Sequence, residues 1–216
     1  MVASATSNQP PRSTGGQAAI IADWKHLPLR VRLARPMGDD ALYDLCAANP
    51  DLRIERTADG EILIMPPTGG ETGLRNAQIT AQLVIWANRD GTGVTFDSSA
   101  GFVLPNGAER APDAAWVSKS RWNALTTEQR KNLVPLCPDF VVELLSPSDI
   151  LDEQRAKLDE YMANGARLGW LIDPDRRQVH VYRAGRNVPD VLDDPSELRG
   201  DPELPGLILD LGAIWP

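Results

Sequence analysis

Alternating apolar and polar positions along the chain predict a series of β-hairpins. Three pairs of runs carry this pattern, over residues 52–56 with 61–65, 101–104 with 109–117, and 168–172 with 178–182. The first pair flanks Asp59-Gly60, which is typical of a type I′ turn, and the second flanks Asn106-Gly107. These hairpins are expected to supply most of a β-sheet.

Apolar residues that recur every three or four positions predict helices over about 39–48, 71–88 and 147–164. A more polar stretch at 119–132 also has a helical pattern. In the second helix, the stripe expected to face the core consists of Leu74, Ala77, Ala81, Val84 and Ile85. Ser146-Pro147 supplies a capping hydroxyl and a first-turn proline for the start of the third helix.

The run at 140–145 is short, almost wholly apolar and rich in β-branched residues, so it predicts a buried central strand. The acidic stretch after Gly185 is expected to be a loop that leads to a short final strand at 207–209. With the hairpins and helices, this order predicts one α/β domain over residues 20–216. Residues 1–19 are rich in Ser, Thr, Gln, Pro and Gly and are expected to be a disordered tail.

Composition places the chain among ordinary globular proteins, with 42% hydrophobic and 24% charged residues. No stretch reaches the roughly 20 apolar residues of a membrane helix, and the N-terminus lacks a secretory signal, so a cytoplasmic location is expected. Cys46 and Cys137 each lie in an apolar segment and are expected to be buried, reduced thiols.

The net charge of −8 argues against a nucleic-acid partner, because phosphate binding normally needs a basic surface. Residues 187–216, however, contain seven acidic residues and one arginine, so −6 of this charge lies there. The rest of the chain carries only −2, which leaves a nucleic-acid partner open.

Glu143 is the residue that most needs a chemical explanation. It interrupts the apolar run 140–145, and burial of a carboxylate without a partner is costly. A partly exposed edge strand or an ion pair with an arginine would explain it, and a metal ligand is the functional alternative. Mg²⁺ takes one or two carboxylates and completes its shell with water and substrate phosphates, so Glu143 would need one nearby acid.

Two aspartates that follow a proline compete for that position. Asp139 is four residues from Glu143 on the same strand, about 13 Å away at about 3.3 Å per residue, and is expected to mark the strand start. Asp113 is expected on the second strand of the hairpin at Asn106-Gly107, and a neighbouring strand about 5 Å away could bring its carboxylate to the same ion. Asp113 is therefore preferred, with a structural aspartate beside a turn as the alternative.

Two further charged residues lie on predicted helices in positions that suit a site. Lys157 shares a helix face with Leu158, which predicts partial burial, although a lysine extended along the helix side is the simpler explanation. Glu71 begins its helix on the same side as Leu74, so it is expected to point toward the core and could be a further ligand. A capping box begun by Thr68 explains Glu71 equally well.

Four segments give the chain a specific resemblance to a known family: ANPDLRIERTADGEILIMPPTGGETG, SSAGFVLPNGAERAPDAAWVS, PDFVVELLSPSD and KLDEYMANGARLGWLIDP. Over roughly residues 30–185 the chain resembles the Uma-type family of restriction endonucleases, a branch of the PD-(D/E)XK nuclease superfamily. The resemblance implies a restriction-endonuclease-like core, in which a mixed β-sheet is flanked by helices and preceded by a β-hairpin.

The resemblance also implies roles for individual residues. Asp113 and Glu143 match the family's Mg²⁺ ligands, with Mn²⁺ as a substitute, and Glu71 matches its helix acid. The superfamily places a lysine two residues after the glutamate, whereas this chain has Leu145 there, and Lys157 matches a lysine supplied from the following helix. The implied reaction is hydrolysis of DNA phosphodiester bonds, in which Lys157 orients the attacking water or neutralises charge on the phosphate.

The function expected on these grounds is that of a Mg²⁺-dependent DNA endonuclease. A homodimer is expected from that function, since two sites can cut both strands of a duplex. The displaced lysine and the acidic charge keep a second hypothesis open, a catalytically silent nuclease-fold module that binds or regulates. A carboxylate-pair hydrolase such as a glycosidase, which needs no metal, is the third.

Overall fold

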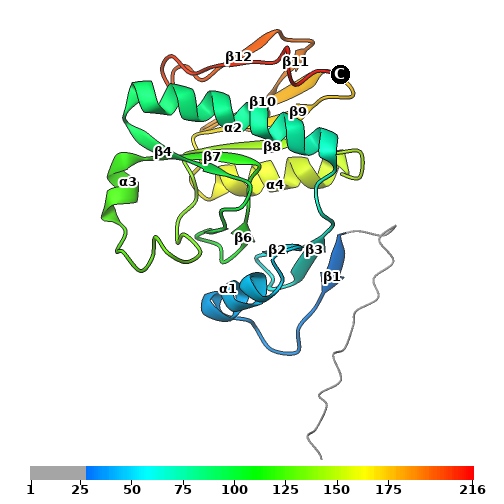
Figure 1. Ribbon diagram of the computed structural model, residues 1–216, viewed down its shortest axis with the longest axis vertical. Coiled ribbons are helices and arrows are strands. Elements are labelled where there is room, and N and C mark those ends of the chain that lie inside the picture. Colours follow the sequence, from blue (N-terminus) through cyan, green and yellow to red (C-terminus); the bar gives the residue numbers. More distant parts are fainter. Residues whose placement is uncertain (1–27) are drawn as a thin grey trace, which may run out of the picture.

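The computed structural model describes residues 28–216 (Figure 1). Its helices are α1 (Asp39–Ala48), α2 (Gly70–Asp90), α3 (Lys119–Ala124) and α4 (Leu151–Ala163). Its strands are β1 (Leu29–Val31), β2 (Arg53–Arg56), β3 (Ile62–Met65), β4 (Gly93–Asp97), β5 (Phe102–Val103), β6 (Glu109–Arg110), β7 (Ala114–Ser118), β8 (Phe140–Leu144), β9 (Leu168–Asp173), β10 (Gln178–Arg183), β11 (Asp190–Asp193), β12 (Glu197–Arg199) and β13 (Ile208–Asp210). The tail predicted at 1–19 lies outside the described residues.

The centre of the fold is a six-stranded sheet with the strand order β11-β10-β9-β8-β7-β4. Strands β8 and β9 are parallel, whereas β7 pairs with β8 and β9 pairs with β10 in the antiparallel sense, so the sheet is mixed. Every residue of β8 is buried, which confirms the predicted central strand. The predicted hairpin of β9 and β10 is confirmed as well.

Helices α2 and α4 cover opposite faces of this sheet (Figure 1). On one face, Trp116 packs in a cluster with Ile79 of α2 and with the C-terminal segment. On the other face, Val141 packs in a cluster with Leu158 of α4. Because successive residues of a strand point to opposite faces, Glu143 lies on the same side of β8 as Val141, toward α4.

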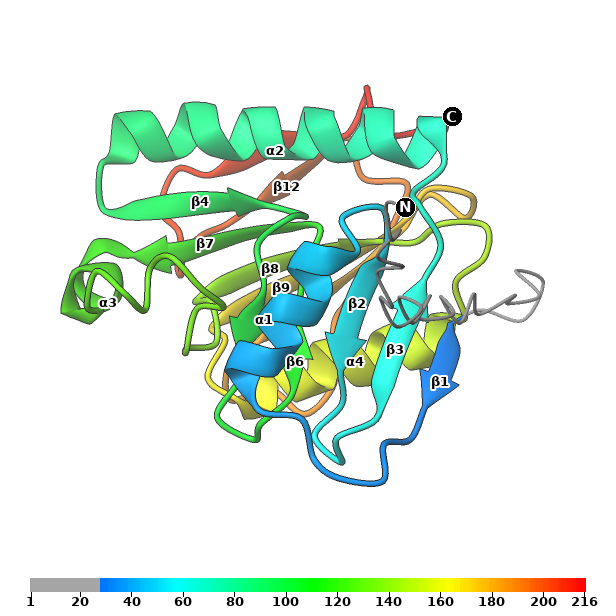
Figure 2. The same ribbon diagram turned by 60° about the horizontal axis from the view of Figure 1, so that its bottom comes forward.

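A second sheet, with the order β1-β3-β2-β6-β5, lies next to α4 (Figure 2). The predicted hairpin of β2 and β3 is confirmed, and α1 confirms the helix predicted at 39–48. Ile54 of β2 packs on Leu42 of α1. The other side of β2 carries Glu55, which contacts Lys157 of α4, so this strand is covered on both sides.

The turn between β2 and β3 differs from the predicted type I′ turn. Type I′ requires a positive φ at both central residues, but in the pair Asp59-Gly60 only Gly60 has one, at 82°. The Gly60 N–H donates to the Thr57 carbonyl, and the Thr57 N–H donates to the Glu61 carbonyl. This pattern is a type I turn followed by a glycine bulge, in which one left-handed residue restores the strand pairing.

The strand predicted over 109–117 is divided. Strand β6 pairs with β2 and β5 in the smaller sheet, whereas β7 pairs with β4 and β8 in the larger one. Pro112 lies between them and lacks the N–H that an uninterrupted ladder would need. Asp113 therefore lies immediately before β7. The prediction that it lies within the second strand of the hairpin was wrong.

Helix α2 confirms the predicted element, but the predicted core-facing stripe was wrong. Leu74 and Ile85 of that stripe are 62% and 52% exposed. Gly69 is the N-cap and no side chain caps it, so the capping box begun by Thr68 is also wrong. The buried positions of α2 are instead Thr72, Arg75, Asn76, Ile79, Leu83 and Ala87.

Three other elements differ from their predicted limits. Helix α4 begins at Leu151 rather than at 147, because residues 146–149 form a loop in which the Asp149 carboxylate accepts the Ser146 N–H at 2.7 Å. Helix α3 ends at Ala124, and turns replace the rest of the stretch predicted as helical. The acidic loop contains β11, which extends the larger sheet, and β12, which pairs with β13.

Two expectations drawn from composition can be compared with the structure. None of the helices in residues 28–216 combines the length and the apolar character required to span a bilayer. Cys46 and Cys137 are free thiols, and Cys137 is buried as predicted, whereas Cys46 is only partly buried.

Candidate active site

Asp113 and Glu143 lie side by side on neighbouring strands. Ala115 pairs with Val141 and Ala114 pairs with Val142, so continuing the antiparallel register by one residue places Asp113 opposite Glu143. Both carboxylates are buried, with residue exposures of 5% and 4%. The pairing expected from the sequence is thus present in the geometry, although Asp113 reaches it from the segment that follows Pro112.

The Asp113 carboxylate is held by donors from three parts of the chain. Its Oδ2 atom accepts the backbone N–H of Leu144 at 2.9 Å, which joins the start of β7 to the end of β8. Its Oδ1 atom accepts from Asn76 Nδ2 of α2 at 3.0 Å and from Arg53 Nη1 of β2 at 3.3 Å. These three hydrogen bonds fix the position and orientation of the Asp113 carboxylate.

The Glu143 carboxylate is paired mainly with α4. Its Oε1 atom lies 2.9 Å from Lys157 Nζ and accepts the Tyr161 hydroxyl at 3.0 Å. Burial raises the pKa of Glu143 to about 7, with Lys157 opposing the rise and the charge of Asp113 adding to it. Burial and the charge of Asp113 therefore both disfavour the ionised form of Glu143.

Lys157 is fixed between two glutamates. Its Nζ atom lies 2.9 Å from Glu143 Oε1 and donates to Glu55 Oε1 of β2, also at 2.9 Å. Burial lowers the pKa of Lys157, but the charges of Glu143 and Glu55 outweigh it, so the pKa is raised and the ammonium stays charged. Burial alone would raise the pKa of Glu55, yet Lys157 and Arg110 lower it to about 2.

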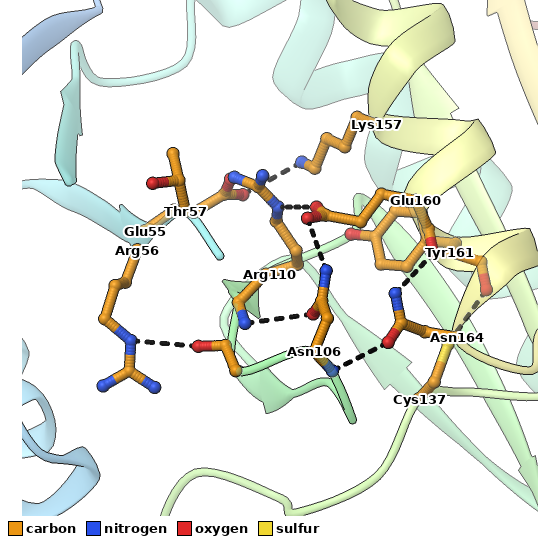
Figure 3. Close-up of polar contacts among 12 residues, drawn as sticks. Glu55, Arg56, Thr57, Asn106, Arg110, Cys137, Lys157, Glu160, Tyr161 and Asn164 are labelled. Carbon is orange, nitrogen blue, oxygen red and sulfur yellow. Dashed lines mark hydrogen bonds and ion pairs between the residues drawn. The ribbon is translucent and has the colours of Figure 1, made fainter. Parts of the chain in front are cut away.

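A polar network ties this lysine helix to the smaller sheet, as Figure 3 shows. Arg110 of β6 bridges Glu55 Oε2 at 3.1 Å and Glu160 Oε2 of α4 at 2.6 Å. Asn106, in the turn before β6, donates to Glu160 Oε1 at 2.9 Å, and its backbone N–H donates to Asn164 Oδ1 at 2.9 Å. Both ends of the β5–β6 hairpin are therefore docked on α4, which orients the helix that carries the lysine.

The two carboxylates and the Lys157 ammonium lie beside a cavity of about 270 Å³. Asp113, Glu143 and Lys157 line its interior side. The β3–α2 connection at 66–69 and the loop at 146–149 form other parts of its wall. Three of the four residues selected from the sequence thus meet in one pocket.

Glu71 is not brought into that pocket. Its side chain is 71% exposed, and its Oε1 atom accepts from Arg75 Nη2 at 2.8 Å. Gly69 and Thr72 line the cavity, whereas Glu71 does not. The expectation that Glu71 points toward the core was wrong, because the apolar spacing along α2 indicates the face that is exposed in the structure. A catalytic role for Glu71 stays a prediction.

Asp139 has a structural setting, as predicted. It directly precedes β8, and its Oδ2 atom accepts the backbone N–H of Ser118 at 2.8 Å. Its Oδ1 atom contacts Arg121 at 3.1 Å and Arg167 at 3.4 Å. These partners neutralise it at the far end of the strand from Leu144.

The donor set fits a hard divalent cation that needs few protein ligands. Mg²⁺ typically takes one or two carboxylates and keeps several waters, and Asp113 and Glu143 provide two carboxylates beside a cavity. A cation there would relieve the repulsion that contributes to the raised pKa of Glu143. Within residues 28–216, no group of three or more His, Cys, Asp and Glu side chains forms a denser metal cage.

Four residues whose side chains contact Asp113, Glu143 or Lys157 were missed from the sequence: Arg53, Glu55, Asn76 and Tyr161. Each lies within a regular strand or helix, and its residue type fits the local pattern of that element, so the sequence did not indicate a role in a site. Alternation places Glu55 on the side of β2 opposite Ile54, the position at which a charged residue in a two-faced strand needs no special explanation. No signal in the sequence indicated that α4 would cover that side.

Glu109 of β6 yields a stability prediction. It is 2% exposed, and burial together with the charge of Glu55 raises its pKa to about 8. The folded state therefore holds a proton that the unfolded chain releases above about pH 4.5, so wild-type stability falls as pH rises from 4.5 to 8.

We expect Glu109→Gln, which does not titrate, to raise the free energy of unfolding at pH 8 by on the order of 3 kcal/mol. The gain should shrink toward zero as pH falls to 4.5. Urea denaturation of both proteins across this range measures it, and an equal difference at every pH would contradict the assignment. Glu61→Gln, at a partly exposed ion pair, is the matched control that should change stability little.

Comparisons with known proteins place this chain in a family. A family model described as "Putative restriction endonuclease" (Uma2) matches residues 39–212. A crystal structure titled as "a putative nuclease belonging to DUF820" from Anabaena variabilis superposes with a TM-score of 0.68 at 20% identity, over 83% of this chain and 98% of that chain. That likeness establishes a shared fold, and no curated protein sequence matches. Because the family model spans most of the chain, this protein belongs to the Uma2 family.

Proposed function

We propose that this protein is a Mg²⁺-dependent nuclease that hydrolyses phosphodiester bonds of DNA. The observation that carries the proposal is the meeting of Asp113, Glu143 and Lys157 in one pocket, with Lys157 Nζ 2.9 Å from Glu143. Membership of the family described as "Putative restriction endonuclease" and a fold shared with a structure titled as "a putative nuclease" support it.

The carboxylates would hold the ion, and the chain fixes both of them in advance. Asp113 is anchored by the backbone of Leu144 and by Asn76, and Glu143 is anchored by Tyr161. Bound Mg²⁺ would supply Lewis-acid stabilisation of the negative charge that develops on the scissile phosphate. Ligands held before binding lower the reorganisation needed when the ion and substrate arrive.

Lys157 would act on the phosphate or on the attacking water. An ammonium has three N–H donors, and the two glutamates accept from two of them. The third donor is available to a group in the cavity that Lys157 lines. A charged donor in a water-poor pocket stabilises developing negative charge more than it would in bulk water.

Cleavage of supercoiled plasmid tests the proposal. With Mg²⁺ or Mn²⁺, wild-type protein should convert supercoiled DNA to nicked or linear forms, and excess chelator should stop the reaction. Lys157→Ala should slow cleavage by about 10²- to 10³-fold, whereas Lys119→Ala, at a lysine whose ammonium donates to the Gly91 carbonyl, should leave it unchanged. Chelator-resistant cleavage, or equal rates in the two lysine variants, would refute the assignment.

A catalytically silent module is the second candidate. It is favoured by the side-chain cations that already contact both carboxylates, since Arg53 contacts Asp113 and Lys157 contacts Glu143. It predicts nucleic-acid binding that persists in chelator, together with no cleavage of plasmid, single-stranded DNA or RNA by folded protein. Any metal-dependent cleavage that requires Glu143 would eliminate it.

A further inference from the structure

A second and larger cavity, of about 670 Å³, adjoins the catalytic pocket. Arg53 and Thr68 line both cavities, so they meet along β2 and the β3–α2 connection. The larger cavity lies between α1 and β2 on one side and β4, α3 and the segment 130–134 on the other. A strand with its scissile phosphate at Asp113 and Glu143 would have a neighbouring nucleotide at this opening.

Aromatic side chains form one wall of this cavity. Trp122 of α3 meets Phe96 of β4 edge-on, with ring centroids 5.3 Å apart. The Arg130 guanidinium lies 5.3 Å from the centroid of the Trp122 ring. Tyr43 of α1, which is 38% exposed, lines the same cavity from α1. Flat rings and a guanidinium plane are the groups on which nucleic-acid bases stack.

Positive charge accompanies these rings. Arg130 and Lys131 are both exposed, both line the cavity, and neither has an ion-pair partner among residues 28–216. Cations without carboxylate partners are available to phosphates, because no existing ion pair has to be broken first. This segment is therefore suited to follow a phosphate backbone, despite the acidic charge of the whole chain.

Glu109 supplies a polar group at the base of the cavity. It lines the cavity and is 2% exposed, and its Oε2 atom is buried with no hydrogen-bond partner in the described residues. Burial raises the pKa of Glu109 to about 8, so the carboxyl is largely protonated at neutral pH and can donate as well as accept. A base edge that entered the cavity would supply the hydrogen-bond partner that this atom lacks among the described residues.

We propose that this cavity receives an unstacked base of the strand being cut, stacked against the Trp122–Arg130 wall, so that the substrate is single-stranded or locally opened nucleic acid. The inference deepens the proposed nuclease function and rests on it, because the bound nucleic acid is a substrate only if the protein is a nuclease. The volume lies within the roughly 300–1,000 Å³ typical of small-molecule pockets. Proteins that accept extruded bases read them by aromatic stacking and by hydrogen bonds to base edges.

Fluorescence anisotropy in excess chelator tests the cavity without cleavage. The probes are a labelled 12-nucleotide single strand and the blunt duplex of the same sequence, at one fixed ionic strength. We expect the single strand to bind at least about tenfold more tightly than the duplex. Trp122→Leu should weaken single-strand binding by roughly 5- to 150-fold, and the conservative variant Trp122→Phe should keep most of it.

Arg130→Gln tests the same wall without removing a partly buried ring. It should weaken single-strand binding by more than about fivefold. The matched control is Arg89→Gln, at an exposed arginine of α2 outside this cavity, which should leave binding unchanged. Thermal unfolding of each variant shows whether it is folded. If Trp122→Leu is unfolded, the binding affinity of Arg130→Gln alone tests the cavity.

In the binding experiment, three results would overturn the inference: equal affinity for single strand and duplex, unchanged single-strand binding in both folded cavity variants, or no binding of either probe. Failure of the nuclease proposal has a different signature. Single-strand binding that depends on Trp122 and Arg130 without any metal-dependent cleavage would support the cavity and refute the nuclease. Normal cleavage of duplex plasmid by folded Trp122→Leu and Arg130→Gln would refute the cavity and support the nuclease.

Discussion

Glu143→Gln should abolish Mg²⁺-dependent nicking of supercoiled plasmid, with a rate loss of about 10³-fold or more. The substitution keeps the shape of the side chain but removes the negative charge that would bind the ion. Loss of the ion removes several kcal/mol of transition-state stabilisation. Folding should survive, because burial already disfavours the charged form of Glu143 and the Tyr161 hydroxyl retains an acceptor.

Asp139→Asn is the matched control for this variant. Asp139 is a buried carboxylate next to the same strand, but its partners are Arg121, Arg167 and the Ser118 backbone rather than the pocket groups. It should lower thermal stability while it leaves the cleavage rate of the folded protein within about twofold. Equal loss of activity in both folded variants would show that the effect reflects general damage to the sheet.

Glu55→Gln should destabilise the protein by on the order of 3 kcal/mol at pH 7. Lys157 and Arg110 both contact Glu55 at 2.9 and 3.1 Å, and the neutral amide would leave two buried cations with less compensation. The pKa of Glu55 is lowered from 4.5 to about 2, and that shift corresponds to a stability contribution of this size. Urea denaturation of both proteins at pH 7 measures it.

The stability contribution of Glu55 should depend on pH in a definite direction. Because the folded-state pKa lies below the unfolded one, the contribution of Glu55 is fully present above about pH 4.5 and is lost as pH falls toward 2. The difference between wild type and Glu55→Gln should therefore shrink as pH falls below 4.5. Glu153→Gln, at an exposed pair with Arg30, should change stability by less than about 1 kcal/mol. A Glu55→Gln effect no larger than this control would refute the buried network.

Helix α2 shows how buried polar residues can lead to a wrong prediction of which helix face is buried. Thr72, Arg75 and Asn76 occupy buried positions, while Leu74 and Ile85 are exposed, so apolar spacing indicated the wrong face. Asn76 is buried because it donates to Asp113. A hydrophobic pattern predicts that a helix exists. It does not indicate that a polar residue is buried when the hydrogen-bond partner of that residue lies far away in the sequence.

Strand β8 shows the opposite case. Its apolar run predicted a buried central strand, and the exception within the run identified Glu143 before any tertiary contact was known. Asp113 could be placed beside Glu143 because strand spacing is fixed, even though the hairpin strand predicted for it is broken at Pro112. Carboxylates that break an apolar pattern are therefore informative, whereas Glu55 fits an alternating pattern and gave no such signal.

Lys157 required more than local pattern. Its spacing on α4 allowed a lysine along the side of the helix, and only the family resemblance assigned it to the site. In the structure α4 begins four residues later than predicted, yet it still directs Lys157 between Glu55 and Glu143. The ion pairs of Arg110 explain why, since they fix α4 against the smaller sheet through contacts 50 and 55 residues apart in the chain.

Crystals of the wild-type protein soaked in Mn²⁺, with data collected for anomalous scattering, test the central claim most directly. The account predicts an anomalous peak within coordinating distance of carboxylate oxygens of both Asp113 and Glu143, and no such peak in Glu143→Gln crystals treated in the same way. Absence of the peak from wild-type crystals at Mn²⁺ concentrations that support cleavage, or a peak bound by other residues, would contradict it.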